Sequence, residues 1–160
     1  MNNFEIRYAT EKDAALILDF IRGIAEYEKM ADEVVATEEL LQEWIFEKKS
    51  AEVIFAMEDG VEVGFALFFY NFSTFVGRAG LYLEDLFVKV EHRGKGYGKA
   101  LLQKLAQIAV ERGCGRMEWV CLDWNKPSID FYRSLDAVPM DEWTIYRLTG
   151  DTLKNLAEKK

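Results

Sequence analysis

Apolar residues recur along the chain at two spacings, one typical of helices and one typical of strands. The first helical pattern predicts a helix that begins after the N-cap Thr10 and continues to Glu28. Its apolar positions are Leu16, Phe20, Ile24 and Tyr27. Residues 29–36 are expected to form a loop, after which Thr37 caps a second helix. The apolar positions of that second helix are Leu40, Leu41, Trp44 and Ile45.

Shorter apolar runs, bounded by turn residues, predict the strands. The pair Asp59-Gly60 is a strong hairpin signal, and it lies between the runs Ala51–Glu58 and Val61–Asn71. The run Ala79–Val88 is apolar enough to be a central strand. The other runs that we expect to be strands are Phe4–Tyr8, Arg116–Leu122 and Trp143–Leu148.

Three further helices are expected in the second half of the chain. Lys99–Arg112 is followed by the helix-ending residue Gly113, Asn125–Leu135 carries Pro127 in its first turn, and Asp151–Lys160 is terminal. The element order β-α-α-β-β-β-α-β-α-β predicts a mixed α/β fold, largely antiparallel at first and with one parallel crossover. Because we find no repeat or linker, we expect residues 1–160 to form a single domain.

The glycine-rich segment Arg93-Gly94-Lys95-Gly96-Tyr97-Gly98 lies between a strand-like run and a helix-like run. Alternate glycines let the backbone approach a ligand closely, and amide groups at a helix N-terminus bind anions. The segment therefore predicts a pyrophosphate site, with an ordinary glycine-rich loop as the alternative. A nucleotide P-loop is excluded because Ala100 stands where a hydroxyl is needed after Lys99, and the G-x-G-x-G spacing is not that of a dinucleotide site.

Charge and composition narrow the class of partner. The 160-residue chain has a formal net charge of -8, which disfavours nonspecific nucleic-acid or anionic-membrane binding and suits a small cationic partner. The N-terminal residues show no secretory signal and no apolar run is long enough for a membrane span, so we expect a cytoplasmic protein. Cys114, Cys121 and the lone His92 form no metal-ligand pattern, and we expect no metal.

The pattern Arg93-x-x-Gly96-x-Gly98 resembles the coenzyme A signature of the GCN5-related N-acetyltransferases (GNAT). The strings Leu81–Val88 and Trp124–Tyr132 narrow the resemblance to the diamine acetyltransferases, which include spermidine/spermine N-acetyltransferases and thialysine-acetylating relatives. The likeness also includes Ile6–Thr10 and Tyr27-Glu28, and so covers nearly the whole chain. It implies a GNAT fold, a central mixed sheet with splayed parallel strands flanked by helices, and a homodimer.

The resemblance also implies where acetyl-CoA binds. The backbone of Leu86, Phe87 and Val88 would pair with the pantetheine amides. The pyrophosphate would be bound by Arg93, Gly94, Lys95, Gly96, Tyr97, Gly98 and Lys99. The thioester end would be lined by Asn125, Lys126, Pro127, Ser128 and Tyr132. In one departure from the family pattern, Asp136 occupies the place of a glycine. Aspartate tolerates left-handed geometry at some cost, so we expect a locally strained or reshaped turn there.

Acetyl transfer to an amine requires the amine to lose a proton and the departing thiolate to gain one. Glu84 is the candidate base, because desolvation in an apolar strand would raise its pKa; its alternative is a structural pair with Arg78. Tyr132 is the candidate acid, with a core aromatic as the alternative. An amide near Phe87 is the candidate oxyanion donor. In a regular strand Asp85 would point to the opposite face, where it forms a salt bridge, an interface contact or a substrate contact.

The resemblance further implies a small cationic amine as substrate. Its contacts would come from Tyr27, Glu28, Glu84, Asp85, Glu118, Trp119 and Glu142. Phe72, Phe75 and Trp124 would line an aliphatic channel or serve in core or dimer packing. We expect a polyamine acceptor such as spermidine or spermine. The alternatives are thialysine or another lysine-like amine, an aminoglycoside, a protein amine and, from a different class, a non-catalytic acetyl-CoA-binding module.

Overall fold

The computed structural model describes residues 3–159, which divide into two compact units at the boundary between Val120 and Cys121. Each unit is described by itself. In the described part of the chain, no helix combines the length and apolar character needed to cross a membrane.

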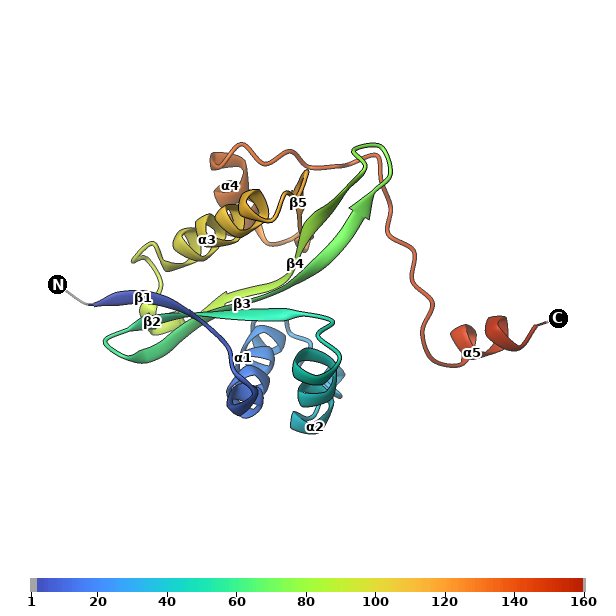
Figure 1. Cartoon of the computed structure of the whole chain (residues 1–160), viewed down its shortest axis with the longest axis horizontal. Helices are drawn as coiled ribbons and strands as arrows, with labels where there is room; N and C mark the ends of the chain where they lie inside the picture. Colours follow the sequence, from blue (N-terminus) through green and yellow to red (C-terminus); the bar gives the residue numbers. More distant parts are fainter. Residues whose placement is uncertain (1–2, 160) are drawn as a thin grey trace. The chain divides into compact units, whose positions relative to one another are not determined.

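The first unit is built on a mixed sheet whose strands lie in sequence order (Figure 1). The strands described are β1 (Phe4–Tyr8), β2 (Glu52–Glu58), β3 (Val61–Ser73), β4 (Arg78–Val88) and β5 (Met117–Glu118). Neighbours from β1 to β4 run antiparallel, and β5 pairs parallel with β4. The predicted hairpin at Asp59-Gly60 is confirmed, with both residues at positive φ as its tight turn requires.

Helices cover both faces of this sheet. On one face lie α1 (Ala14–Tyr27) and α2 (Glu38–Leu41), which continues as a π-helical segment Gln42–Glu47; α3 (Tyr97–Glu111) lies on the other (Figure 1). The predicted cap at Thr10 is confirmed. The Thr10 amide donates to the Asp13 carboxylate at 2.7 Å, which fixes the short 3₁₀ turn Glu11–Asp13 in front of α1.

The core between α1 and the sheet consists mainly of aromatic rings. Phe65 of β3 is fully buried, and its ring stacks on Phe20 of α1 with 5.1 Å between centroids. Phe55 of β2 lies beside the same ring at 5.9 Å. These contacts fix α1 against the strands that position the site.

Truncating this core should destabilise the protein strongly. Phe65→Ala removes a fully buried ring, so we expect the free energy of unfolding to fall by about 3–5 kcal/mol in urea denaturation. Phe75→Ala is the matched control because that side chain is fully exposed, and its change should stay within about 0.5 kcal/mol. Equal losses for the two variants would contradict this description of the core.

The predicted strand Arg116–Leu122 is mostly wrong, because only Met117 and Glu118 pair with β4. The cause lies in β4. In the ladder between β3 and β4, Leu67 pairs with Asp85 and the next residue, Phe68, pairs with Leu83. Glu84 is therefore an extra residue in a β-bulge. A bulge bends its strand and interrupts the ladder. Among the residues described, the β5 side of β4 is therefore unpaired beyond Tyr82.

The second unit contains α4 (Lys126–Ser134) and α5 (Gly150–Glu158). The predicted helix with Pro127 in its first turn is confirmed as α4. It is followed by Asp136 at a φ of 65°, so of the two expected alternatives, a strained or a reshaped turn, the structure has the strained left-handed one. The terminal helix begins one residue earlier than predicted and ends at Glu158, within the described residues.

The predicted strand Trp143–Leu148 is wrong. The segment is irregular and exposed, with Trp143 at 77% and Tyr146 at 92% of full accessibility. Its apolar alternation suits a strand, but a strand exists only where another strand satisfies its backbone groups. No described strand pairs with it.

Candidate active site

The predicted pyrophosphate loop has the backbone geometry that an anion site needs. Gly94 and Gly96 adopt left-handed conformations with φ of 79° and 82°, which an L-residue would resist. Gly96 is the N-cap of α3 and no side chain caps the helix. The N-cap residue therefore supplies no side-chain acceptor at the start of α3, in the position where helix N-termini bind phosphate.

Arg93 is bound to the protein on two sides. Its Nε donates a hydrogen bond to the Val88 carbonyl at 2.8 Å. Its guanidinium lies over the rings of Tyr27 and Phe87, 5.1 and 5.2 Å from their centroids. The side chain thus connects the end of α1 with the end of β4 and with the loop.

Lys95, the second predicted cation of this loop, donates to Glu58 Oε1 at 2.8 Å. This hydrogen bond is the main cause that raises the pKa of the Lys95 ammonium. Sequence reasoning missed Glu58, because nothing in its neighbourhood distinguishes it from the other acidic residues that end strands. Lys99 is exposed on the first turn of α3.

The residues predicted to pair with pantetheine, Leu86, Phe87 and Val88, lie in the part of β4 that has no partner on its β5 side. Leu86 and Val88 face α3, since a Cβ on Gly98 would lie 3.8 and 4.0 Å from them. Phe87 faces α1, where a Cβ on Gly23 would approach its ring to 3.1 Å. One continuous segment of the first unit thus contains left-handed glycines, a helix N-terminus without a side-chain cap and an unpaired strand edge. These features fit coenzyme A.

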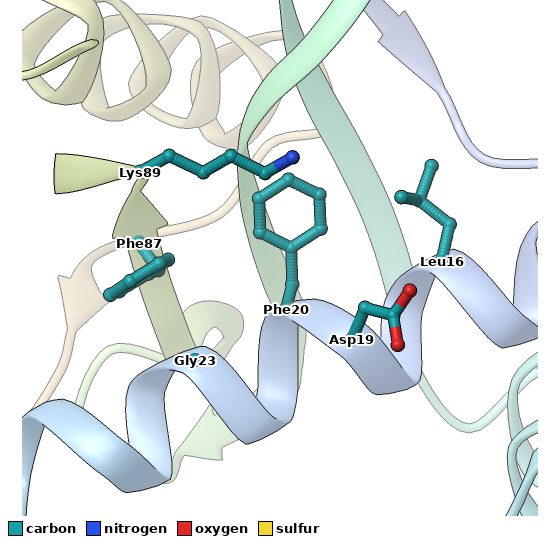
Figure 2. Close-up of a pocket in the computed structure, with 6 residues that line it drawn as sticks. All are labelled: Leu16, Asp19, Phe20, Gly23, Phe87 and Lys89. Atoms are coloured by element: carbon teal, nitrogen blue, oxygen red, sulfur yellow. The ribbon is translucent and has the colours of Figure 1, made fainter. Parts of the chain in front are cut away.

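A pocket of about 160 Å³ lies between α1 and the end of β4 (Figure 2). Its lining residues are Leu16, Asp19, Phe20, Gly23, Phe87 and Lys89. The Lys89 ammonium lies 5.3 Å from the centroid of the Phe20 ring. Since small-molecule sites usually enclose about 300–1,000 Å³, this pocket by itself is too small for a coenzyme or a polyamine.

The bulge in β4 also changes the direction of the acidic side chains. In a regular strand Asp85 would share a face with Leu83, but the extra residue puts it on the α1 face together with Phe87. The expectation that Asp85 points away from Glu84 assumed a regular strand, and the bulge means that this condition is not met. Glu28, which caps the C-terminus of α1, completes a group of three carboxylates.

Burial, reinforced by the charges of Glu84 and then Glu28, raises the pKa of Asp85 to about 7. Burial and the charge of Glu84 raise the pKa of Glu28 as well. Glu84 itself is exposed, so the desolvation expected for it is wrong and applies to its neighbour instead. Within residues 3–159 none of the three belongs to a salt bridge, so the expected alternative pair of Glu84 with Arg78 is absent.

Four other predicted contact residues of the first unit lie elsewhere on it. Glu118 accepts from Asn71 Nδ2 at 3.1 Å and lies 3.2 Å from Arg116 Nε, so it already has protein partners. Its neighbour Trp119 is partly buried after β5. Phe72 and Phe75 are exposed at the β3–β4 hairpin, which excludes the core packing expected as one alternative for them.

The remaining predicted residues belong to the second unit. Asn125 is buried and caps α4 by accepting from the Ser128 amide at 3.4 Å. Lys126 forms an ion pair with Asp130 at 2.9 Å. The ring of Tyr132 lies 5.7 Å from that of Phe131, while Trp124 and Glu142 are exposed.

Comparison with known proteins agrees with this geometry. The model of the acetyltransferase (GNAT) family matches residues 18–136. Thialysine N-epsilon-acetyltransferase of Bos taurus is 37% identical, over 96% of this chain and 97% of that protein. The Caenorhabditis elegans protein of the same name is 36% identical, over 99% and 100%. A human spermidine/spermine N(1)-acetyltransferase-like protein is 32% identical, over 98% of this chain but only 24% of its own length.

Solved structures show a similar fold. An integron cassette protein from the mobile metagenome of V. cholerae superposes with a TM-score of 0.82 at 29% identity, and covers 98% of both chains. An aminoglycoside acetyltransferase from a soil metagenomic sample superposes with a TM-score of 0.77 at 20% identity, over 91% of this chain and 95% of that one. The second likeness concerns the fold alone.

Proposed function

The chain belongs to the GNAT family of acetyltransferases, and we propose that it transfers the acetyl group of acetyl-CoA to a primary amine of a small polycationic substrate. The observation that carries this proposal is the group formed by Glu84 and Asp85 of β4 with Glu28 at the end of α1, beside the unpaired edge of β4. Three carboxylates that form no ion pair within the described residues suit an amine with more than one positive charge. A polyamine such as spermidine or spermine has that chemistry.

A lysine-like amine such as thialysine is the second candidate acceptor. The relatives named for thialysine align over nearly the full length of both chains, which favours this substrate. Both candidates present an alkylammonium to the same carboxylates, and they differ in the carboxylate that a lysine-like molecule carries at its other end. The match to an enzyme family favours either of them over a non-catalytic binding module.

Acetyl-CoA, when bound, supplies an activated thioester. The backbone of Leu86, Phe87 and Val88 and the amides of residues 94–98 are the groups proposed to hold it, together with the Arg93 guanidinium. An amide of β4 near Phe87 would also donate to the carbonyl oxygen of the acetyl group. We place Asn125–Ser128 in the same role at the thioester end, on the resemblance alone.

Removing a proton from the amine is the first chemical requirement. An alkylammonium has a pKa near ~10.4, so only about one amine in two thousand is neutral at pH 7. Asp85, with a pKa of about 7, is present in both protonation states at neutral pH, as an efficient proton acceptor should be. In the proposal Asp85 takes the proton, and the exposed Glu84 orients the ammonium directly or through a water molecule.

Protonating the departing thiolate is the second requirement, and Tyr132 is proposed as the acid. A thiol near pKa ~8.5 and a phenol near ~10 are close enough for transfer through a short hydrogen bond. Tyr27, Trp119 and Glu142 complete the proposed substrate contacts on the resemblance alone. A homodimer and a cytoplasmic location are further parts of the proposal on the same basis.

Glu28→Gln tests recognition at more than one point of the substrate. We expect kcat/KM for spermidine to fall tenfold or more, because the distal ammonium loses an ionic hydrogen bond. A short monoamine should lose less than about twofold. Glu26→Gln on the exposed side of α1 is the matched control. Equal losses for spermidine and the monoamine would count against this recognition mode.

Thiol release from acetyl-CoA, followed with a panel of acceptors, tests the function as a whole. The panel contains spermidine, spermine, thialysine, lysine and an aminoglycoside. We expect turnover with at least one polyamine or lysine-like amine. Binding of acetyl-CoA without thiol release for any amine of the panel would contradict the proposed function.

A further inference from the structure

Glu58 is a buried carboxylate at the end of β2, only 7% exposed, in a molecule whose acidic residues are otherwise largely at the surface. A buried charge is expensive unless it is paired and hydrogen-bonded. The partners of Glu58 come from the coenzyme loop. Lys95 Nζ and the Tyr97 hydroxyl each donate to its Oε1 at 2.8 Å.

The other oxygen of Glu58 faces His92. The imidazole Nδ1 lies 2.6 Å from Oε2, at the end of the short turn that precedes the loop. One carboxylate thus contacts residues before, within and after the pair Gly94 and Gly96.

The strand end that carries Glu58 is itself fixed. Glu58 pairs with Phe4 across the β1–β2 ladder, and the Phe4 ring stacks on Tyr97 at 4.7 Å with an interplanar angle of 13°. Tyr97 is the first residue of α3 and is buried. The N-terminus of α3 is therefore joined to β2 by the hydrogen bond between Tyr97 and Glu58, and to β1 by the ring contact between Tyr97 and Phe4.

We propose that Glu58 is a positioning residue for coenzyme binding, which holds residues 92–97 in the conformation that presents the loop amides to the pyrophosphate. The inference rests on the proposed function. The loop contains two left-handed glycines, which lose more conformational freedom on ordering than other residues. An anchor that orders the loop in advance lowers the entropy lost when the ligand binds.

A second consequence concerns Lys95. Because its ammonium is paired with Glu58, the phosphate is bound mainly by backbone amides and not by this cation. The two possible roles of Lys95 predict opposite effects of Glu58→Gln. If Glu58 anchors the loop, the variant binds coenzyme A more weakly; if Glu58 competes with phosphate for Lys95, the variant binds more tightly.

The test is calorimetric titration of coenzyme A and acetyl-CoA into the full-length protein and its variants. For Glu58→Gln we expect the Kd to rise tenfold or more, which follows from the loss of charge-assisted hydrogen bonds. Lys95→Met should weaken binding in the same direction. The double variant should be little worse than either single one, since both act through one contact. Glu91→Gln, exposed in the same turn, is the charge-matched control and should bind as the wild type does.

Steady-state kinetics separate positioning from general damage. For Glu58→Gln the KM for acetyl-CoA should rise with the Kd, while kcat at saturating acetyl-CoA and the KM for the amine stay within about twofold. Tyr97→Phe removes one hydrogen bond and keeps the ring stack on Phe4, so it gives a smaller rise in Kd and provides the test if Glu58→Gln does not fold.

Three outcomes would overturn the inference. The first is unchanged or tighter coenzyme binding by Glu58→Gln. The second is a fall in the kcat of Glu58→Gln with an unchanged KM for acetyl-CoA. The third, if Glu58→Gln cannot be obtained folded, is wild-type coenzyme affinity in Tyr97→Phe. Failure of the wild-type protein itself to bind acetyl-CoA would instead contradict the proposed function.

Discussion

Asp85→Asn is expected to lower kcat by about a hundredfold or more and, at the same time, to raise the melting temperature above pH 7. The catalytic loss follows from the proposed role of Asp85 as proton acceptor, since general base catalysis contributes about 10²–10⁴-fold. The amide has nearly the shape of the carboxylate, so the substitution tests the charge and leaves packing almost unchanged. A residue with a purely structural role would not combine lower activity with higher stability.

The pH dependence of the rate follows from the same carboxyl. Since the pKa of Asp85 is about 7, kcat/KM of the wild-type enzyme should rise with pH through this region as the base becomes ionised. Asp85→Asn should lose this limb of the profile. Glu84→Gln should retain the limb at a lower overall rate, because Glu84 is proposed to orient the ammonium.

The stability change has the opposite sign from that of a typical paired carboxylate. Burial raises the pKa of Asp85 from its ordinary value of 3.8 to about 7, so between these two values the folded state holds a proton that the unfolded state has lost. Stability therefore falls as pH rises through this window, and the full deficit is present above pH 7. The Asp85→Asn variant would carry no such deficit, because an amide does not ionise.

Thermal melts at pH 5 and pH 8 measure this difference. We expect Asp85→Asn to gain stability relative to the wild type mainly at pH 8. Asp32→Asn, which changes an exposed carboxylate, is the control and should show no such pH dependence. A variant that is less stable at both pH values and keeps the wild-type rate would show that Asp85 is a structural residue.

Tyr132→Phe is expected to lower kcat by about a hundredfold with little change in the affinity for acetyl-CoA. The phenyl ring keeps the half-buried position of Tyr132 beside Phe131, so only the proposed proton donor is lost. Thiol release at saturating acetyl-CoA and amine is the measurement, and calorimetry with acetyl-CoA provides the affinity.

Tyr146→Phe is the matched control for this prediction, because it removes a hydroxyl from an exposed tyrosine of the same unit. Its turnover should equal that of the wild type. If Tyr132→Phe binds acetyl-CoA normally and releases thiol at the wild-type rate, the assignment of the acid is wrong.

Features that depend on neighbouring residues were predictable from the sequence. The Asp59-Gly60 hairpin, the Thr10 cap and the strained turn at Asp136 all follow from backbone preferences within a few residues, and all three are confirmed. The glycine loop is of the same kind. Its alternate glycines predicted a backbone that can approach a ligand closely in front of a helix, and Gly94 and Gly96 have left-handed conformations there.

Features that depend on distant partners were not predictable. The strand pattern at Trp143–Leu148 forms no ladder with any described strand, and Arg116–Leu122 pairs only at Met117 and Glu118. The bulge at Glu84 cannot be recognised in the apolar pattern of the sequence. Yet the bulge decides that Asp85, and not Glu84, is the carboxyl shielded from solvent in this part of β4. Glu58 acquires its role only through residues more than thirty positions away.

The amino-acid order alone therefore determined the family, the mixed α/β class and the location of the glycine-rich loop, because turns, caps and glycine conformations are local properties. The tertiary structure decided that Asp85 is the desolvated carboxylate, that Lys95 is already paired and that the pairing of β4 with β5 stops at Tyr82. These outcomes depend on burial and on charges brought together from separate elements, and neither exists before the sheet has formed.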